Sequence, residues 1–167
     1  MTAGTTERAT KEGTIAIYQH SNGKIASMVE LRCETDFVTR NADFQQLAKD
    51  LCLHVAGTPN PPIAVRREDI ASDVIEKEMA ILREQEDVKS KPANVQDKIL
   101  DGRMRKFYEE RVLLEQPFVK DDKITIKALI EDKIKTIKEN IQIGGFTRWV
   151  LGNDPILAVN KGLASGE

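Results

Sequence analysis

The side chains best suited to nucleophilic, acid–base or metal chemistry are few in this sequence and widely spaced. They are two cysteines, Cys33 and Cys52, and two histidines, His20 and His54. A structural zinc site needs four Cys or His ligands, and a nucleophile needs a neighbouring base. The cysteines form no CxxC pair, so we interpret them as buried core residues, and the histidines as surface or helix-capping residues. The sequence predicts neither a metal centre nor a cofactor.

Patterns for phosphate binding and acid–base catalysis are also missing from the sequence. It contains no GxxxxGK[ST] loop, and its glycines are too scattered to surround a phosphate. The Asp and Glu residues fall on the polar faces of expected helices, where they are usually solvated. We therefore predict that the protein is not an enzyme and acts by binding other molecules.

One short segment, Thr35-Asp36-Phe37-Val38, lacks a simple structural explanation. It lies between an expected strand and an expected helix, and its apolar residues fall outside the apolar stripe of that helix. Phe37 is either tucked into the local core or displayed on a short turn between charged neighbours. A displayed aromatic side chain is how a small protein concentrates binding energy. These four residues are the candidate partner-binding site.

The strand before this segment belongs to an expected β-hairpin over residues 14–34. Asn22-Gly23 favours a two-residue type I′ turn, in which both central residues have positive φ. The second strand alternates apolar and polar side chains, which indicates one buried face. In this register Ile17 lies opposite Met28, so the other face is also partly apolar. Such a face needs a cover, which another subunit would supply.

Amphipathic helices follow the hairpin. The first has a continuous apolar stripe over residues 44–55, and further helices are expected to begin at Ser72, Pro92 and Thr125. A last extended segment, residues 143–151, should pair with the hairpin across the whole domain. The sequence therefore predicts an α+β fold with a small three-stranded antiparallel sheet and about four helices.

Glycines inside two of these elements indicate special local geometry. Gly102 lies within the third helix, where it costs about 1 kcal/mol relative to alanine. We take it as a sign that another element packs closely there. Gly144 and Gly145 weaken the last strand and predict a β-bulge.

Composition and charge limit the class of partner. The 167 residues are 40% hydrophobic and 31% charged, which is typical of an ordered, water-soluble domain. With 25 basic and 27 acidic side chains the net charge is −2. Direct nucleic-acid binding is not expected, because it depends on a positive surface. No apolar run reaches the roughly 18 residues of a membrane span.

The chain is divided on composition into three parts. Residues 1–13 are polar and are expected to be a flexible N-terminal segment, residues 14–152 form one domain, and residues 153–167 form a flexible tail rich in small and polar residues. The first residues lack the apolar stretch of a secretory signal. We expect a cytoplasmic protein, with an organelle protein that has lost its transit peptide as the alternative.

The candidate segment and its surroundings resemble the signature of the bacterial and organellar elongation factor Ts family. The signature is here Arg32-Cys33-Glu34-Thr35-Asp36-Phe37-Val38-Thr39-Arg40-Asn41, followed by Phe44, Leu47, Ala48, Lys49 and Asp50. Three further stretches are similar to family motifs: Tyr18, His20 and Gly23; Leu114-Glu115-Gln116-Pro117-Phe118-Val119-Lys120-Asp121; and Phe146, Arg148, Leu151 and Gly152. Together these matches span residues 13–152 in the family's order.

The resemblance implies a single copy of the family's core and dimerisation domain, a three-stranded sheet with flanking helices. It also implies guanine-nucleotide exchange on elongation factor Tu, the GTPase that delivers aminoacyl-tRNA. In the family the Asp and Phe of the signature push into Tu near its Mg²⁺ and phosphate site. On this chain the resemblance implies that Phe37 is the wedge and Asp36 its polar companion. Single-core members form homodimers.

The family's usual N-terminal helical domain has no counterpart in residues 1–13. The alternative function is therefore a non-catalytic Tu-binding or dimerisation module with reduced exchange activity. Accelerating GDP release ten-thousandfold takes about 5.5 kcal/mol, whereas burial of one Phe supplies about 1.5–3 kcal/mol. Phe37 would therefore need a broad second interface to hold it in place.

Overall fold

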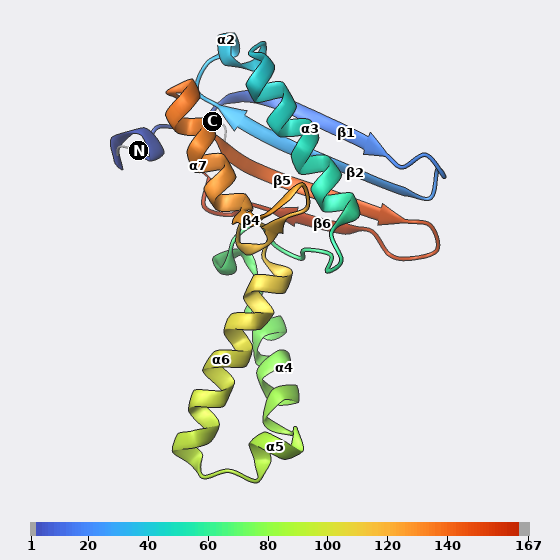
Figure 1. The fold of residues 1–167 in the computed structure, drawn as a ribbon, viewed down its shortest axis with the longest axis vertical. Helices are drawn as coiled ribbons and strands as arrows, with labels where there is room; N and C mark the ends of the chain where they lie inside the picture. The colour runs from blue at the N-terminus through green and yellow to red at the C-terminus, as the bar shows by residue number, and fades with distance from the viewer. Residues whose placement is uncertain (1–2, 164–167) are drawn as a thin grey trace.

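A computed structural model describes residues 3–163, in which a helical arm projects from a body of sheet and helices (Figure 1). The strands are β1 (Glu12–Gln19), β2 (Ile25–Cys33), β3 (Pro117–Phe118), β4 (Asp121–Thr125), β5 (Gln142–Val150) and β6 (Ile156–Val159). The helices are α1 (Ala3–Thr6), α2 (Asp36–Thr39), α3 (Ala42–Gly57), α4 (Ser72–Arg83), α5 (Glu86–Lys89), α6 (Ala93–Arg111) and α7 (Ile126–Ile137). Single 3-10 turns lie at Arg67–Asp69 and Leu113–Glu115. The predicted α+β class is confirmed.

The main sheet is antiparallel and has the strand order β1-β2-β5-β6, and β3 and β4 form a separate pair. The prediction of three strands was therefore too low. The three expected strands are β1, β2 and β5, and β6 is the strand that the sequence did not indicate. Its four apolar residues lie in a stretch rich in Gly, Asn and Ser, which suggested a flexible tail. Pairing with β5 orders Ile156–Val159 instead.

The register of the first hairpin matches the prediction, but its turn type does not. Ile17 lies opposite Met28, as expected. Of the residues in the turn, only Gly23 has positive φ, at 73°. Its N–H donates to the His20 carbonyl (2.8 Å), and the Asn22 side chain accepts from the Lys24 N–H (2.9 Å). The connection is a turn with one left-handed glycine rather than a type I′ turn.

The predicted β-bulge in the last strand is confirmed. Glu30 pairs with Gly145, whereas its neighbour Leu31 pairs with Ile143, so Gly144 is the extra residue. A side chain on Gly144 would overlap the Glu30 carboxylate, and a Cβ on Gly145 would lie 2.7 Å from the backbone oxygen of Ala158. Gly145 therefore needs glycine because the backbone of β6 approaches it closely, whereas a side chain at position 144 would require the Glu30 side chain to move.

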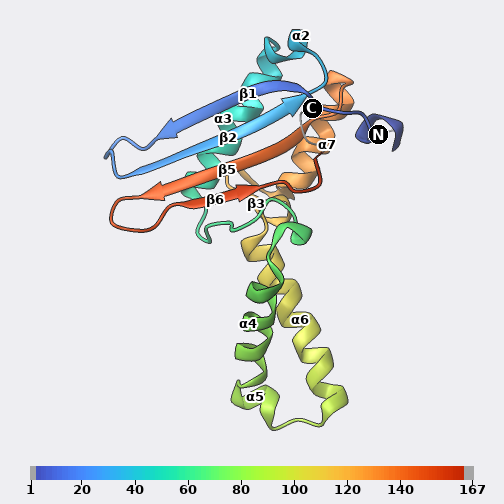
Figure 2. The same ribbon diagram turned by 180° about the vertical axis from the view of Figure 1, so that it is seen from behind.

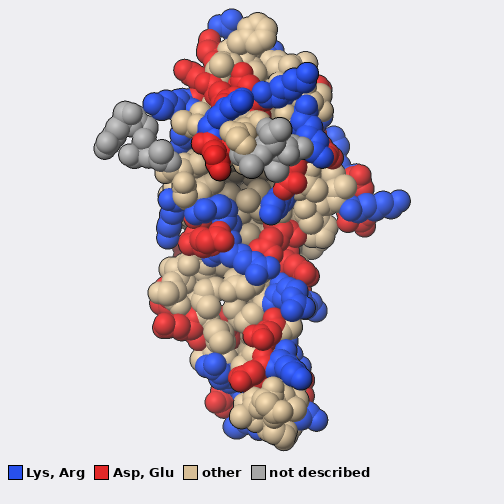
Figure 3. Space-filling model, turned by 90° about the vertical axis from the view of Figure 1, so that its left-hand side faces the viewer, with Lys and Arg blue, Asp and Glu red and all other residues tan. Residues whose placement is uncertain are grey.

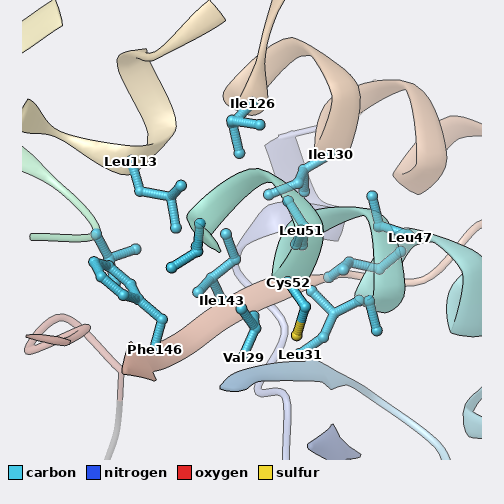
Figure 4. Close-up of a cluster of buried hydrophobic side chains, with 14 of the residues drawn as sticks. Val29, Leu31, Leu47, Leu51, Cys52, Leu113, Ile126, Ile130, Ile143 and Phe146 are labelled. Atoms are coloured by element: carbon cyan, nitrogen blue, oxygen red, sulfur yellow. The ribbon is translucent and has the colours of Figure 1, made fainter. Parts of the chain in front are cut away.

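Helices α3 and α7 cover one face of the main sheet and enclose the core (Figures 1 and 4). Asn41 caps α3 by accepting from the Phe44 N–H (3.1 Å). The whole predicted stripe of this helix is buried: Phe44, Leu47, Ala48, Leu51, Cys52 and Val55. Both cysteines are free and buried, as interpreted from the sequence. The apolar inner faces of β2 and β5 and the side chains of α7 complete the core.

Helices α4, α5 and α6 form the arm, which has a small apolar core of its own. Its buried members are Leu82, Val88, Leu100 and Met104. Gly102 is exposed, and a Cβ there would meet nothing within 4 Å, so the expected close packing was wrong. The four predicted helices correspond to α3, α4, α6 and α7. The others in the described part have four residues each, too few to show a helical period.

Both segments predicted as flexible are held by side-chain contacts where the structure describes them. Thr10 is buried, donates to Gln142 (2.7 Å) and accepts from Arg32 through its carbonyl (2.7 Å). Near the other end Asn160 donates to the Ile143 carbonyl (3.0 Å). The Lys161 N–H donates to the side chain of Asp69, at the base of the arm (2.9 Å). The N-terminal segment and the tail are thus partly ordered; residues 1–2 and 164–167 lie outside the described part.

His54 is fully buried, so its interpretation as a surface residue was wrong. Its Nδ1 accepts from the Val119 N–H (3.2 Å), and its Nε2–H donates to Gln116 (2.8 Å). The Gln116 side-chain amide in turn donates to the Asn60 and Glu110 carbonyls, both at 2.7 Å. This network joins α3 to the base of the arm and fixes the neutral tautomer of the ring. Burial lowers the pKa of His54 below its ordinary value of 6.5, and the Gln116 bond opposes this in part.

We predict that the free energy of unfolding decreases as the pH falls below about 6.5, because the unfolded chain then takes up a proton that folded His54 resists. The decrease is at most about 1.4 kcal/mol per pH unit. Urea unfolding between about pH 7.5 and 5.5 measures it. The His54→Asn variant should show a smaller decrease, whereas His20→Gln, a change at an exposed ring, should match the wild type. An unchanged decrease in His54→Asn would assign it to another group.

Candidate partner-binding site

The candidate segment forms a single helical turn, α2, between β2 and α3. Thr35 is its N-cap, and the threonine hydroxyl accepts from the Val38 N–H (3.4 Å). Successive residues in a helix point about 100° apart, so the burial of one fixes the direction of the next. Val38 is buried in the core at 6% exposure, and Phe37 is directed outward at 79% exposure. The structure therefore displays Phe37 rather than tucking it into the core.

The charged neighbours of Phe37 are also exposed. Arg40 donates to the Asp36 carboxylate (2.8 Å), one helical turn away, and the Thr39 hydroxyl donates to the Asp36 carbonyl (2.5 Å). An exposed ion pair of this kind contributes little to stability. The Asp36 carboxylate is therefore accessible beside the phenyl ring and can exchange its arginine for a group on a partner.

The backbone of the turn is fixed by a residue far away in the sequence. Glu139, which follows α7, accepts from the N–H groups of Glu34 (3.1 Å) and Thr35 (3.0 Å) and from the Thr35 hydroxyl (2.6 Å). The Cys33 thiol contacts the Thr35 carbonyl at 3.2 Å. Burial, with the nearby negative charge of Glu139, raises the pKa of this thiol to about 11. The thiol stays protonated at neutral pH and is part of the support, not a nucleophile.

The four candidate residues thus divide by role. Thr35, Asp36 and Phe37 lie together on the surface, whereas Val38 points into the core and anchors the turn. Sequence reasoning missed Glu139. The available signal was a charged residue a few positions before the expected strand over residues 143–151. That strand was expected to pair with the hairpin, whose second strand ends at the candidate segment.

No helix of the described residues covers the face of the main sheet opposite α3 and α7 (Figure 2). The register aligns Ile17, Met28, Thr147 and Leu157 in one row across all four strands. Alternation places six exposed apolar side chains on this face: Ile15 (61%), Ile17 (72%), Met28 (43%), Trp149 (59%), Leu157 (76%) and Val159 (54%). We call this surface the open sheet face. Neighbouring exposed apolar side chains of this kind mark a protein–protein contact.

The described residues provide neither a metal centre nor a membrane-spanning helix. Among residues 3–163 no group of three or more His, Cys, Asp or Glu side chains is placed to hold a metal ion. None of the helices in that range has the length and apolar character needed to cross a membrane. On the side seen in Figure 3, basic and acidic side chains are interspersed over the body and the arm.

A supported turn that displays an aromatic ring, together with an open sheet face, is typical of the class of proteins that act through contacts with other proteins. A sequence model described as elongation factor TS matches residues 2–153. Elongation factor Ts of Maridesulfovibrio salexigens is 51% identical over 84% of this chain and 68% of its own length. The relatives of the same name from Oleidesulfovibrio alaskensis (50% identical) and Coprothermobacter proteolyticus (46%) are each matched over 87% of this chain and 73% of their own length. The chain belongs to the elongation factor Ts family and is a translation elongation factor.

The different burial of Val38 and Phe37 predicts that their truncation affects stability unequally. Val38→Ala should decrease the free energy of unfolding by about 1–3 kcal/mol, because it leaves a cavity in the core. Phe37→Ala should change it by no more than about 0.5 kcal/mol, because the ring is exposed. Urea unfolding of both variants tests this. A larger loss for Phe37→Ala than for Val38→Ala would contradict the outward orientation of the ring.

Proposed function

We propose that this chain is a guanine-nucleotide exchange factor for elongation factor Tu, and not itself an enzyme. In this proposal α2 inserts Asp36 and Phe37 near the Mg²⁺ and phosphate site of Tu and so promotes release of GDP. The observation that carries it is the 79% exposure of Phe37 on a turn whose backbone is fixed. An apolar ring that is exposed in the free protein gains most when a partner buries it.

The exchange mechanism follows from linkage between two ligands of Tu. A factor that binds Tu more tightly without GDP than with it must weaken GDP binding by the same factor. Burial of one Phe supplies about 1.5–3 kcal/mol, which corresponds to about one to two powers of ten in rate. Larger accelerations need further contacts, which hold Phe37 at the GTPase rather than act on the nucleotide.

The second candidate function is a Tu-binding or dimerisation module with reduced exchange activity. The open sheet face favours it, because exposed apolar side chains on an uncovered sheet face favour association with another protein. The two functions differ in one measurable respect. A chain that binds Tu but leaves the GDP release rate unchanged would support the module. Either function would be carried out in the cytoplasm, without direct contact with a membrane or nucleic acid.

We predict that Phe37→Ala slows GDP release from Tu by about ten- to a hundredfold relative to the wild-type chain, because the ring no longer inserts. Stopped-flow release of a fluorescent GDP from Tu measures the rate. The control is Ile81→Ala, which removes an exposed apolar side chain (53%) from the arm and should leave the rate unchanged. Equal rates for wild type and Phe37→Ala would refute the wedge.

We also propose that the open sheet face binds a second copy of the chain. A two-fold axis brings the same patch of both subunits together, so an apolar row such as Ile17–Met28–Leu157 meets apolar groups on its partner. Sheets pack face to face at about 10 Å with their apolar side chains interleaved. Glu30 and Arg32, 3.8 Å apart on this face, offer charges of both signs for the same pairing.

We predict that the wild-type chain sediments as a dimer and that Ile17→Glu sediments as a monomer, because a buried charge without a partner opposes association. Analytical ultracentrifugation at micromolar concentration measures the mass against the 18.7 kDa of one chain. Ile81→Glu, an equivalent change on the arm, should stay dimeric. A monomeric wild type, or a dimer that persists in Ile17→Glu, would show that the second copy binds elsewhere or not at all.

A further inference from the structure

The side chain of Glu139 makes all three of its hydrogen bonds to the start of the candidate turn. One carboxylate oxygen accepts from the backbone N–H groups of Glu34 and Thr35, at 3.1 and 3.0 Å, and the other accepts from the Thr35 hydroxyl at 2.6 Å. Hydrogen bonds to an ionised acceptor are stronger than those between neutral groups. Glu139 therefore restrains both the backbone and the N-cap side chain of α2.

The backbone before Glu139 adopts an unusual conformation. Lys138 ends α7 with φ at +67°, and it is the only non-glycine residue in the described part with positive φ. A left-handed residue at a helix C-terminus reverses the chain sharply, and lysine is disfavoured there. Local strain of this kind persists where the surrounding contacts require it. Here the reversal places Glu139 against the turn.

A further hydrogen bond joins the residues after β2 to those before β5, and here the donor lies before β5. The Asn140 N–H donates to the Glu34 carboxylate (3.4 Å), and Arg8 lies 3.6 Å from that carboxylate. The Asn140 side chain donates to the Thr6 carbonyl (3.2 Å) and the Arg8 carbonyl (2.7 Å). The turn after β2 and the turn before β5 are thus fixed by each other and by the N-terminal segment.

Phe37 itself is too exposed to be oriented by its own packing. Its direction depends on the backbone of α2, which is attached to the body through Val38 on one side and Thr35 on the other. Val38 belongs to the core, so changing it alters folding. Glu139 supports the turn from the surface, so its contribution to the direction of Phe37 can be tested separately from folding.

We propose that Glu139 is a positioning residue for nucleotide exchange, which holds α2 in the orientation in which Phe37 enters the partner GTPase. This inference rests on the proposed exchange function. A displacement of about 1 Å at a reacting site can lower a rate by up to a hundredfold. Loss of the three bonds should therefore reduce the maximal rate of GDP release more than the affinity for Tu.

The test compares Glu139→Ala with Glu139→Gln and with Asp132→Ala in the full chain. Glu139→Ala should lower the maximal rate of fluorescent GDP release from Tu about tenfold, with a half-saturating concentration within about twofold of wild type. Glu139→Gln keeps an oxygen for the two backbone N–H groups and should stay within about threefold of the wild-type rate. Asp132→Ala removes an exposed carboxylate from α7, the helix that precedes Glu139, and should have no effect.

Two further measurements separate positioning from a general structural effect. Amide hydrogen exchange at Glu34 and Thr35 should become at least about tenfold faster in Glu139→Ala, while amides of α3 keep their wild-type protection. In a double-mutant cycle, Glu139→Ala should cause no further loss in a Phe37→Ala background, because it acts through that ring.

The outcomes distinguish this inference from the proposed function. If Phe37→Ala slows release and Glu139→Ala does not, the positioning role is wrong and the exchange function stands. If neither variant slows release, the wedge role of Phe37 fails, and with it the role of Glu139. If the wild-type chain itself does not accelerate GDP release, the exchange function fails. Additive losses in the double mutant, or faster hydrogen exchange throughout α3, would show that Glu139 acts on the fold and not through Phe37.

Discussion

The central pairing of β2 with β5 is the contact on which the rest of the structure depends. It joins residues 25–33 to residues 142–150, so that every element from α2 to α7 lies within the loop that it closes. In an antiparallel pair, the end of one strand lies beside the start of the other. The turn after β2 and the residues before β5 are therefore neighbours, although 104 residues separate Thr35 from Glu139. The support of the candidate site is a direct consequence of sheet topology.

The same closed loop contains the arm, which is attached to the body at its base. A parallel bridge joins Ala64 to Val112, and the Leu113 N–H donates to the Ala64 carbonyl (2.9 Å). The buried His54–Gln116 network lies at this junction and satisfies the backbone carbonyls that the crossing leaves inside. Because the arm has its own small core beyond this junction, the sheet and α2 do not depend on its tip for packing.

Patterns in the local sequence predicted those elements whose structure depends mainly on their own residues. The stripe of α3, the hairpin register and the Gly144 bulge follow from periodicity and glycine geometry, and all are confirmed. Strand β6 could not be predicted, because its pairing with β5 overrides a composition typical of loops. The burial of His54 and the bonds of Glu139 depend on residues more than sixty positions away. Such contacts are set by topology and leave no local pattern.

The outward direction of Phe37 results from the contacts of its neighbours in the four-residue segment Thr35-Asp36-Phe37-Val38. A single helical turn is unstable in isolation, because its nucleus fixes several dihedral angles for one hydrogen bond. Here Val38 is buried on one side, while Thr35 accepts from the turn and is bonded to Glu139 on the other. These contacts offset the conformational entropy that is lost when the turn is ordered, and none of them involves the phenyl ring. The ring stays exposed on a backbone that is already ordered, so that binding a partner buries apolar surface without first having to order that backbone.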